Sequence, residues 1–128
     1  MSNSIVLNKV SKKFVTNKKI NVLNKISYKF VKGKIYSLVG PSGSGKSTLL
    51  NILSLIDKPS RGNIKIFNKE INYNNISNND VIRASNIGII YQQNNLLPDF
   101  TALENVYLAR PALQNNKNEA LQKAKRLI

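Results

Sequence analysis

Eight consecutive residues have the types and spacing of a loop that binds phosphate groups: Gly40, Pro41, Ser42, Gly43, Ser44, Gly45, Lys46 and Ser47. They fit the pattern G-x-x-x-x-G-K-[ST], in which backbone N–H groups wrap a polyphosphate at close range. Gly43 and Gly45 permit backbone angles and a close approach that a Cβ would obstruct. Lys46 is expected to reach the β and γ phosphates, and the Ser47 hydroxyl to join the shell of Mg²⁺. The sequence therefore predicts a site for a nucleoside triphosphate, with Mg·ATP as the expected ligand.

The segments on either side of this loop suit that role. An apolar run at 35–39 leads directly into Gly40 and is expected to be a buried parallel strand. Apolar residues follow at helical spacing, so a helix is expected from Lys46; they are Leu49, Leu50, Leu53 and Ile56. Such a helix presents unpaired N–H groups and its positive dipole end to the phosphates. The alternative, a flexible Gly- and Ser-rich loop that happens to contain Lys-Ser, would require neither element.

The rest of the chain is predicted to form a small antiparallel sheet, one more buried strand and several short helices. Apolar patterning predicts strands at 4–10, 22–30, 63–67, 70–73 and 87–91, the first two antiparallel to each other. Further helices are expected at about 77–84, after an N-cap at Ser77, and from Thr101, which forms a capping box with Glu104. A last helix is expected at 119–128, with one side formed by Leu121, Ala124, Leu127 and Ile128.

Composition excludes several classes of chemistry. The 128 residues allow one domain, and the absence of cysteine and histidine excludes disulfides, thiolate metal sites and imidazole catalysis. No apolar run approaches the length of a membrane span, and the first residues carry no secretory signal. The net charge of +14 indicates either an anionic partner or a biased composition. Scattered lysines without interleaved aromatic residues favour the second interpretation.

Beyond the loop, several runs resemble ATP-binding cassette (ABC) transporter ATPases over essentially the whole chain. The resemblance is carried by residues 41–53, 55–62 and 87–93, and by 96–106, which is closest to the lipoprotein-releasing branch. It implies an α/β fold: a P-loop NTPase (RecA-like) core with an antiparallel β subdomain, truncated before the second half of the parallel sheet. Such a sheet is expected to have an unpaired edge and exposed apolar surface.

The same resemblance assigns domains and further site residues. Residues 1–95 correspond to the N-terminal part of the ATP-binding domain, and 96–128 to the start of an incomplete helical subdomain. Phe14 corresponds to the aromatic residue that stacks on adenine; the alternative is a core residue at a strand end. Gln92 corresponds to the glutamine that touches Mg²⁺ or the attacking water, alongside Ser47 as a metal ligand; the alternative is an ordinary polar loop residue. Thr48 extends the set of nucleotide-binding residues.

The resemblance also implies partners and a cellular position. The expected partners are ATP, integral membrane transporter subunits and a second ATP-binding subunit, at the cytoplasmic face of the inner membrane, with nucleic acid not expected. Leu96, Leu97 and Phe100 are either the surface that docks a membrane subunit or core residues. The activity implied is ATP hydrolysis coupled to lipoprotein release from that membrane.

Several motifs of these ATPases are absent from the sequence. It contains no Leu-Ser-Gly-Gly-Gln signature, no apolar strand that ends in Asp-Glu after Tyr91, and no histidine. Because phosphoryl transfer depends on positioned charge, the chain alone is expected to bind nucleotide weakly and to turn it over little. It is therefore interpreted as an N-terminal half. The alternative is a non-catalytic remnant that holds nucleotide or a membrane partner without turnover.

Overall fold

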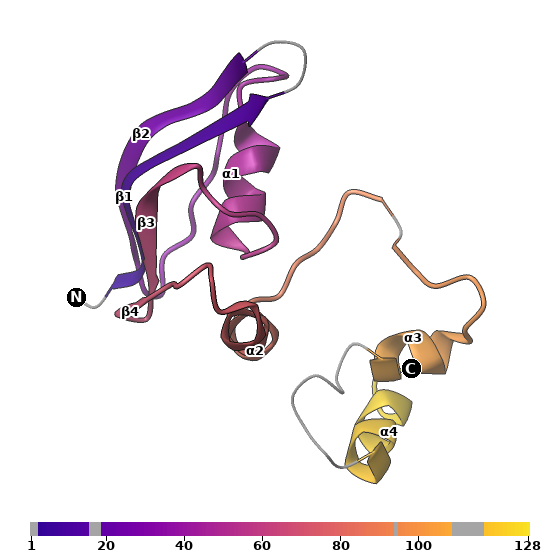
Figure 1. Cartoon of the computed structure of the whole chain (residues 1–128). Coiled ribbons are helices and arrows are strands. Elements are labelled where there is room, and N and C mark those ends of the chain that lie inside the picture. Colours follow the sequence, from indigo (N-terminus) through magenta and orange to yellow (C-terminus); the bar gives the residue numbers. More distant parts are fainter. Residues whose placement is uncertain (1–2, 16–18, 94, 109–116) are drawn as a thin grey trace. The chain divides into compact units, whose positions relative to one another are not determined.

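A computed structural model describes residues 3–15, 19–93, 95–108 and 117–128 (Figure 1). The chain divides into two compact units, Met1–Asn79 and Asp80–Ile128, which are described separately below. The domain boundary expected near residue 95 stays a prediction.

The first unit contains a four-stranded antiparallel sheet. Its strands are β1 (Asn3–Val15), β2 (Lys19–Val31), β3 (Arg61–Ile66) and β4 (Lys69–Glu70), in the order β2-β1-β3-β4. β1 therefore pairs with β2 on one side and with β3 on the other. The predicted antiparallel pairing of β1 with β2 is confirmed, and both strands extend beyond their predicted ends. The strand predicted at 70–73 is wrong for residues 71–73, because β4 contains only Lys69 and Glu70.

Four register shifts interrupt the pairing of β1 with β2, and two of them are β-bulges that contain a residue with positive φ. The bulged residues are Lys9, with φ 49°, and Lys25, with φ 48°. The N–H of Lys9 donates to Ser27 Oγ at 2.9 Å, and the N–H of Lys25 donates to Ser11 Oγ at 2.9 Å. The two serine hydroxyls thus replace the ladder acceptors that each bulge loses, and they keep both N–H groups satisfied.

The core of the first unit lies between the sheet and helix α1 (Lys46–Leu53) (Figure 1). Its buried side chains come from both elements: Leu7, Val10, Leu23, Ile64 and Ile66 from the strands, and Leu49 and Ile52 from the helix. Burial of each such side chain contributes about 1.5–3 kcal/mol. The spacing of Leu49 and Ile52 directs both toward the sheet and so fixes the helix that follows the phosphate loop.

Helix α1 is shorter than its apolar spacing predicts. Ser54 Oγ donates to Leu50 O at 2.7 Å, and Leu55 adopts φ 59°, so the helical backbone ends before Ile56. Ile56 is exposed. The helical spacing of apolar residues therefore included Ile56 wrongly, because the backbone has already left the helix at Leu55.

Two predicted parallel strands are wrong as strands. Residues 35–39 and 87–91 have no regular secondary structure, and Ile35 and Ile90 are 101% and 100% exposed. A strand buried in a parallel sheet depends on ladder partners on its edges. Among the described residues no strand pairs with either segment, so both stay irregular and largely exposed despite their apolar composition. The expected exposed apolar surface is confirmed.

The second unit contains helices α3 (Ala102–Leu108) and α4 (Lys117–Lys125), which contact each other. The predicted capping box is confirmed, because the Glu104 N–H donates to Thr101 Oγ1 at 3.3 Å and the Thr101 N–H donates to Glu104 Oε2 at 2.8 Å. The predicted apolar side of α4 is partly wrong. Ala120 and Ala124 are buried, whereas Leu121, Leu127 and Ile128 are exposed.

Helix α2 (Ile76–Asn86) begins earlier than predicted. Its N-cap is Asn75 rather than Ser77, because Asn75 Oδ1 accepts the N–H of Asn78 at 3.1 Å. The side chain of Asn79 is buried and donates to Asn72 O at 2.9 Å, which holds the start of the helix against the preceding turn.

Candidate phosphate-binding site

The base of the phosphate loop (residues 40–47) rests on β2. Gly45 has φ 89°, and a Cβ placed there would lie 3.0 Å from the carbonyl oxygen of Val22 and 3.0 Å from side-chain carbons of Val22 and Leu23. Gly43 has φ 77°, and a Cβ placed there would meet no other atom within 4 Å. Gly45 is therefore required by both its backbone angle and its close packing, whereas Gly43 is required by its angle alone.

The start of helix α1 supplies N–H groups to the loop. The first helical hydrogen bond after the loop runs from the Leu49 N–H to Gly45 O at 2.9 Å. The N–H groups of Lys46, Ser47 and Thr48 precede it and so have no acceptor within the helix. Gly45 provides no side-chain cap, and the first turn contains no acidic residue. The N-terminus of α1 therefore combines unpaired donors with the positive end of a helix dipole, as an anion site requires.

Lys46 folds back over the loop. Its Nζ donates to Gly40 O and to Pro41 O, both at 2.7 Å. Among the described residues it forms no ion pair, so its charge is balanced only by two carbonyl dipoles. Hydrogen bonds from an ammonium to a charged oxygen are stronger than those to a neutral carbonyl. An anionic oxygen placed in the loop would therefore compete well for this ammonium.

The hydroxyl of Ser47 is suitable as a metal ligand. Ser47 is exposed, and its Oγ forms no hydrogen bond with another described residue. A neutral oxygen beside a phosphate site is a typical ligand of Mg²⁺, which usually keeps several waters and binds the phosphates as well. In the described part of the chain no group of three or more Asp and Glu side chains could hold a metal ion. The residues present thus fit a Mg²⁺ ion that is bound mainly by phosphate oxygens and water, with Ser47 as a single protein ligand.

Phe14 lies on β1, in the same unit as the loop, and is 41% exposed. This exposure argues against a role as a core residue. The Nζ of Lys12 lies 5.1 Å from the centroid of the Phe14 ring, as in a cation–π contact. The exposed ring offers an aromatic surface for stacking, and its role with adenine stays a prediction.

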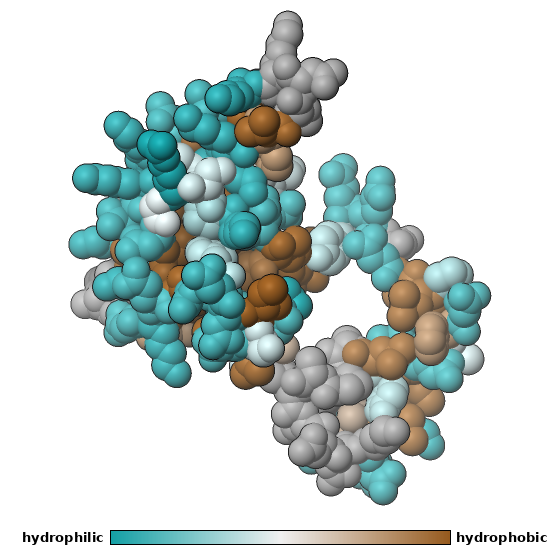
Figure 2. Space-filling view, in the orientation of Figure 1, coloured by the Kyte–Doolittle hydropathy of each residue, from teal (hydrophilic) through white to brown (hydrophobic). Residues whose placement is uncertain are grey.

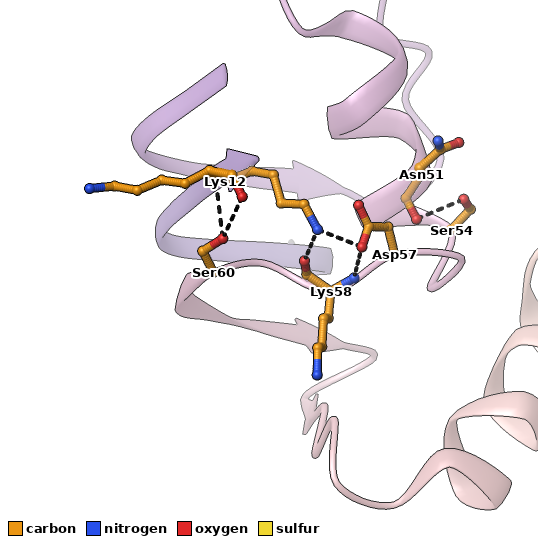
Figure 3. A network of polar contacts seen from close by, with 7 residues as sticks. Lys12, Asn51, Ser54, Asp57, Lys58 and Ser60 are labelled. Atoms are coloured by element: carbon orange, nitrogen blue, oxygen red, sulfur yellow. Dashed lines mark hydrogen bonds and ion pairs between the residues drawn. The ribbon is translucent and has the colours of Figure 1, made fainter. Parts of the chain in front are cut away.

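Lys12 is held by a polar network that the sequence did not reveal (Figure 3). Its Nζ contacts Asp57 Oδ1 at 2.6 Å and donates to Lys58 O at 2.8 Å, and Asp57 Oδ1 also accepts the Lys58 N–H at 2.7 Å. The Lys12 and Asp57 side chains are 11% and 31% exposed. The network joins β1 to the segment that follows α1, and it therefore fixes the helix at its far end from the loop.

Tyr73 adds to the buried polar groups near Asp57. Burial, together with the negative charge of Asp57, raises the pKa of Tyr73 to about 12. Its hydroxyl is buried and has no hydrogen-bond partner among the residues that the structure describes. Tyr73 is therefore neutral at physiological pH, and its hydroxyl carries an uncompensated desolvation cost.

Gln92 belongs to the second unit and is exposed, directly after the segment 87–91. Its predicted role at the metal therefore stays a prediction. Leu96, Leu97 and Phe100 are also exposed in this unit. The Asn105 side chain orders the backbone that carries them, because it donates to Leu97 O, Phe100 O and Thr101 O and accepts the Leu97 N–H. None of the described helices reaches the length and hydrophobicity needed to cross a bilayer.

Comparison with known proteins supplies the family. A model of the ABC transporter family matches residues 23–128. The lipoprotein-releasing system ATP-binding protein LolD of Rickettsia bellii is 42% identical over the whole chain, which covers 57% of that protein. LolD of Cytophaga hutchinsonii is also 42% identical, over 90% of the chain and 52% of that protein. The chain thus spans about half the length of these curated relatives.

A solved structure agrees with this result. The ATP-binding cassette MJ0796, solved as a dimer in a post-hydrolysis state bound to ADP and Pi, superposes with a TM-score of 0.83 and is 35% identical, over 95% of this chain and 54% of that one. The predicted cassette fold is therefore confirmed for the half that this chain spans. On the matched family model and this shared fold, the chain belongs to the ABC transporter family.

Proposed function

We propose that the phosphate loop binds Mg·ATP and that the chain is part of the ATP-binding subunit of an ABC transporter. The observation that carries this proposal is the start of α1, where three N–H groups lack helical acceptors, an uncompensated ammonium lies beside them, and no acid is present in the first turn. A triphosphate supplies the negative charge and the acceptors that such a site lacks. The ADP and Pi of the MJ0796 structure support a nucleotide as the ligand.

Each loop residue then has a defined role. Gly40, Pro41, Ser42, Gly43 and Ser44 form the backbone turn around the phosphates, and Gly45 anchors that turn on β2. Lys46 exchanges its two carbonyl acceptors for phosphate oxygens. Ser47 binds Mg²⁺, and Thr48 contributes its N–H at the helix start. Mg²⁺ neutralises part of the phosphate charge when it is bound.

Lys46→Ala tests the proposal, with Lys34→Ala as a matched control because Lys34 is an exposed lysine outside the loop. ATP binding is measured by titration calorimetry in the presence of Mg²⁺. Loss of one charge-assisted contact is expected to weaken binding about tenfold or more for Lys46→Ala and to leave the control unchanged. Equal ATP affinity in the wild type and in Lys46→Ala would overturn the assignment.

Lipoprotein release from the inner membrane is the finer part of the proposal, and similarity to LolD supports it. Residues 96–128 would then begin the helical subdomain after the nucleotide-binding part, 1–95. Leu97 and Phe100 are proposed to contact an integral membrane subunit at the cytoplasmic face, because they are exposed on a backbone that Asn105 orders. Leu97→Ser is expected to reduce copurification with that subunit while ATP binding is unchanged. Unreduced copurification would exclude this surface.

A second candidate function is nucleotide binding without turnover. The two acidic residues of the first unit are both engaged: Asp57 contacts Lys12, and Glu70 accepts a hydrogen bond from Asn63 Nδ2 at 2.7 Å. In the described part of that unit no other carboxylate could polarise an attacking water. ATPase assays with the membrane subunits and a second ATP-binding subunit distinguish the two functions. Stimulated phosphate release supports the transporter ATPase, and unstimulated background supports the binding-only function.

A further inference from the structure

The positive charge of this chain is concentrated in one unit. Residues 1–79 contain 14 of the 20 basic residues and two of the six acidic ones, whereas residues 80–128 contain six and four. The asymmetry comes mainly from the scarcity of acidic residues in the first unit, which leaves it with a net charge of +12 against +2 for the second. Hydrophilic side chains cover much of the surface over the strands of the first unit (Figure 2). The excess charge therefore calls for a local explanation within this sheet.

A hollow of about 560 Å³ lies over β1, β2 and β3 and collects four of these cations. They are Lys9, Lys13, Lys25 and Arg61. The remaining lining is mostly amide and hydroxyl side chains, which include Asn21 and Asn24, and no acidic residue lines it. No residue of the phosphate loop or of α1 contributes to this lining, so the hollow is separate from the site described above.

Two of the four basic residues that line the hollow occupy strained backbone positions. Lys9 and Lys25 are the bulged residues of β1 and β2, and each has a positive φ. Lysine at such an angle is disfavoured by about 1–2 kcal/mol, and glycine would adopt it without that cost. β-Bulges commonly redirect a side chain toward a functional position. The two bulges therefore place two lysine residues in the lining of the same hollow, at a cost in stability.

The third strand is shaped to fit these bulges. Gly62 on β3 has φ 85°, and a Cβ there would lie 2.4 Å from Lys9 O and 2.6 Å from Asn8 O. Only glycine permits β3 to lie this close to the bulge of β1. Arg61 precedes it and pairs in register with Ser11, whose hydroxyl supports the Lys25 bulge. The cations are thus positioned by the backbone of three strands.

No described carboxylate neutralises these side chains. Lys9, Lys13, Lys25 and Arg61 form none of the ion pairs found in the described part of the chain. Glu70 accepts a hydrogen bond from the side-chain amide of Asn63, which lines the hollow, but Glu70 itself does not line it. All four residues are exposed, so solvent screens much of their mutual repulsion, and a bound anion would relieve what remains. Lysine, arginine and asparagine together are typical ligands of phosphate oxygens.

We propose that this hollow is a second anion site, which binds a phosphate group independently of the phosphate loop. Its chemical class of ligand is a phosphate monoester, diester or pyrophosphate with at least one charged oxygen. Two sources supply this chemistry: a free phosphate compound, or the headgroup of an acidic phospholipid. The lining offers no aromatic face on which a nucleic-acid base could stack.

Inorganic pyrophosphate, measured by titration calorimetry without Mg²⁺, tests the site. The informative variant is Lys13→Gln with Arg61→Gln, because neither side chain has a hydrogen bond or ion pair with another described residue. Lys32→Gln with Lys34→Gln is the control, because it removes the same charge from exposed positions outside the hollow. Lys46→Ala separates this site from the phosphate loop.

Lys13→Gln with Arg61→Gln is expected to weaken pyrophosphate binding at the hollow about tenfold or more. Binding at the hollow is expected to persist in the control and in Lys46→Ala. Full affinity in the hollow variant, with binding abolished by Lys46→Ala, would overturn the proposal. Asn24→Asp, with Asn74→Asp as its control, gives an independent test, because it places a carboxylate among the four cations without removing a contact. Equal pyrophosphate affinity in these two variants would also count against the site.

Vesicle flotation distinguishes the two sources. Vesicles of phosphatidylcholine alone are compared with vesicles that also contain phosphatidylglycerol. The site binds a lipid headgroup if the protein floats with vesicles that contain phosphatidylglycerol and if Lys13→Gln with Arg61→Gln abolishes this flotation while the control variant keeps it. Pyrophosphate binding without flotation assigns it to a free phosphate compound. Absence of both pyrophosphate binding and flotation would refute the site.

Discussion

Replacement of single glycines in the phosphate loop tests how the loop is supported. Gly43→Ala places a Cβ at φ 77° in open space, so its cost is the left-handed backbone angle alone, about 1–2 kcal/mol. Gly45→Ala imposes a similar angle at φ 89° and also places the Cβ 3.0 Å from Val22 O. Backbone atoms yield less than side-chain ends, so crowding adds about 1–3 kcal/mol. Gly45→Ala is therefore expected to cost about 2–5 kcal/mol in total.

The assay is urea unfolding followed by far-UV circular dichroism, with ATP titration of each variant under native conditions. The midpoint is expected to fall further for Gly45→Ala than for Gly43→Ala. ATP affinity is expected to fall for both, because both displace the N–H groups at the start of α1. Equal midpoints for the two variants would refute the inference that β2 supports the base of the loop.

Four further predictions concern the surroundings of the site. Ile52→Ala empties a fully buried position on α1 and is expected to lower the free energy of unfolding by about 2–5 kcal/mol, measured by urea titration. Leu50→Ala, at an exposed position on the same helix, is the control. A smaller loss for Ile52→Ala than for Leu50→Ala would contradict the packing described. Asp57→Asn is expected to cost about 2 kcal/mol, because the largely buried Lys12 ammonium loses its carboxylate partner. A double-mutant cycle with Lys12→Met measures the coupling between the two side chains. Tyr73→Phe is expected to stabilise the protein by about 1 kcal/mol, because it removes a buried hydroxyl without a partner in the described part of the chain. The pKa of Tyr73 rises from 10.0 to about 12 on folding, so the unfolded chain ionises first and the wild type loses stability above pH 10. The variant should not show this loss. Hydrogen bonds from the Thr101 side chain and then from its backbone N–H lower the pKa of Glu104. The capping box should therefore stabilise α3 above the ordinary glutamate pKa and lose this effect as the pH falls through the lowered pKa. An NMR pH titration that gives the same Glu104 pKa in the wild type and in Thr101→Val would contradict this.

Local patterns in the sequence were sufficient for much of the fold. Alternating residues located β1 and β2 because each strand has one face on the core, and Thr101 with Glu104 located the start of α3 because a capping box is complete within four residues. The phosphate loop was found in the same way, since its glycines, Lys46 and the following leucines are adjacent in the chain. Features whose cause lies within a few residues were predictable.

Features that depend on distant parts of the chain were not. Residues 35–39 have the composition of a strand, but a strand in a sheet needs partners that no local pattern supplies. Lys12 and Asp57 are 45 positions apart, and nothing in either neighbourhood indicates that they meet. The bulges at Lys9 and Lys25 lack the glycine that usually marks a positive φ, and the only available signal was Gly62, on a different strand.

The exposed run at 35–39 has a consequence for handling the protein. An uncovered stretch of β-forming apolar residues is a template on which further copies can add, and mutual repulsion between molecules of charge +14 opposes this. Such repulsion acts over about 10 Å at 0.1 M ionic strength and over about 3 Å at 1 M. Added sodium chloride should therefore turn a dispersed preparation into a turbid one, and dilution into low-salt buffer should delay the onset of light scattering.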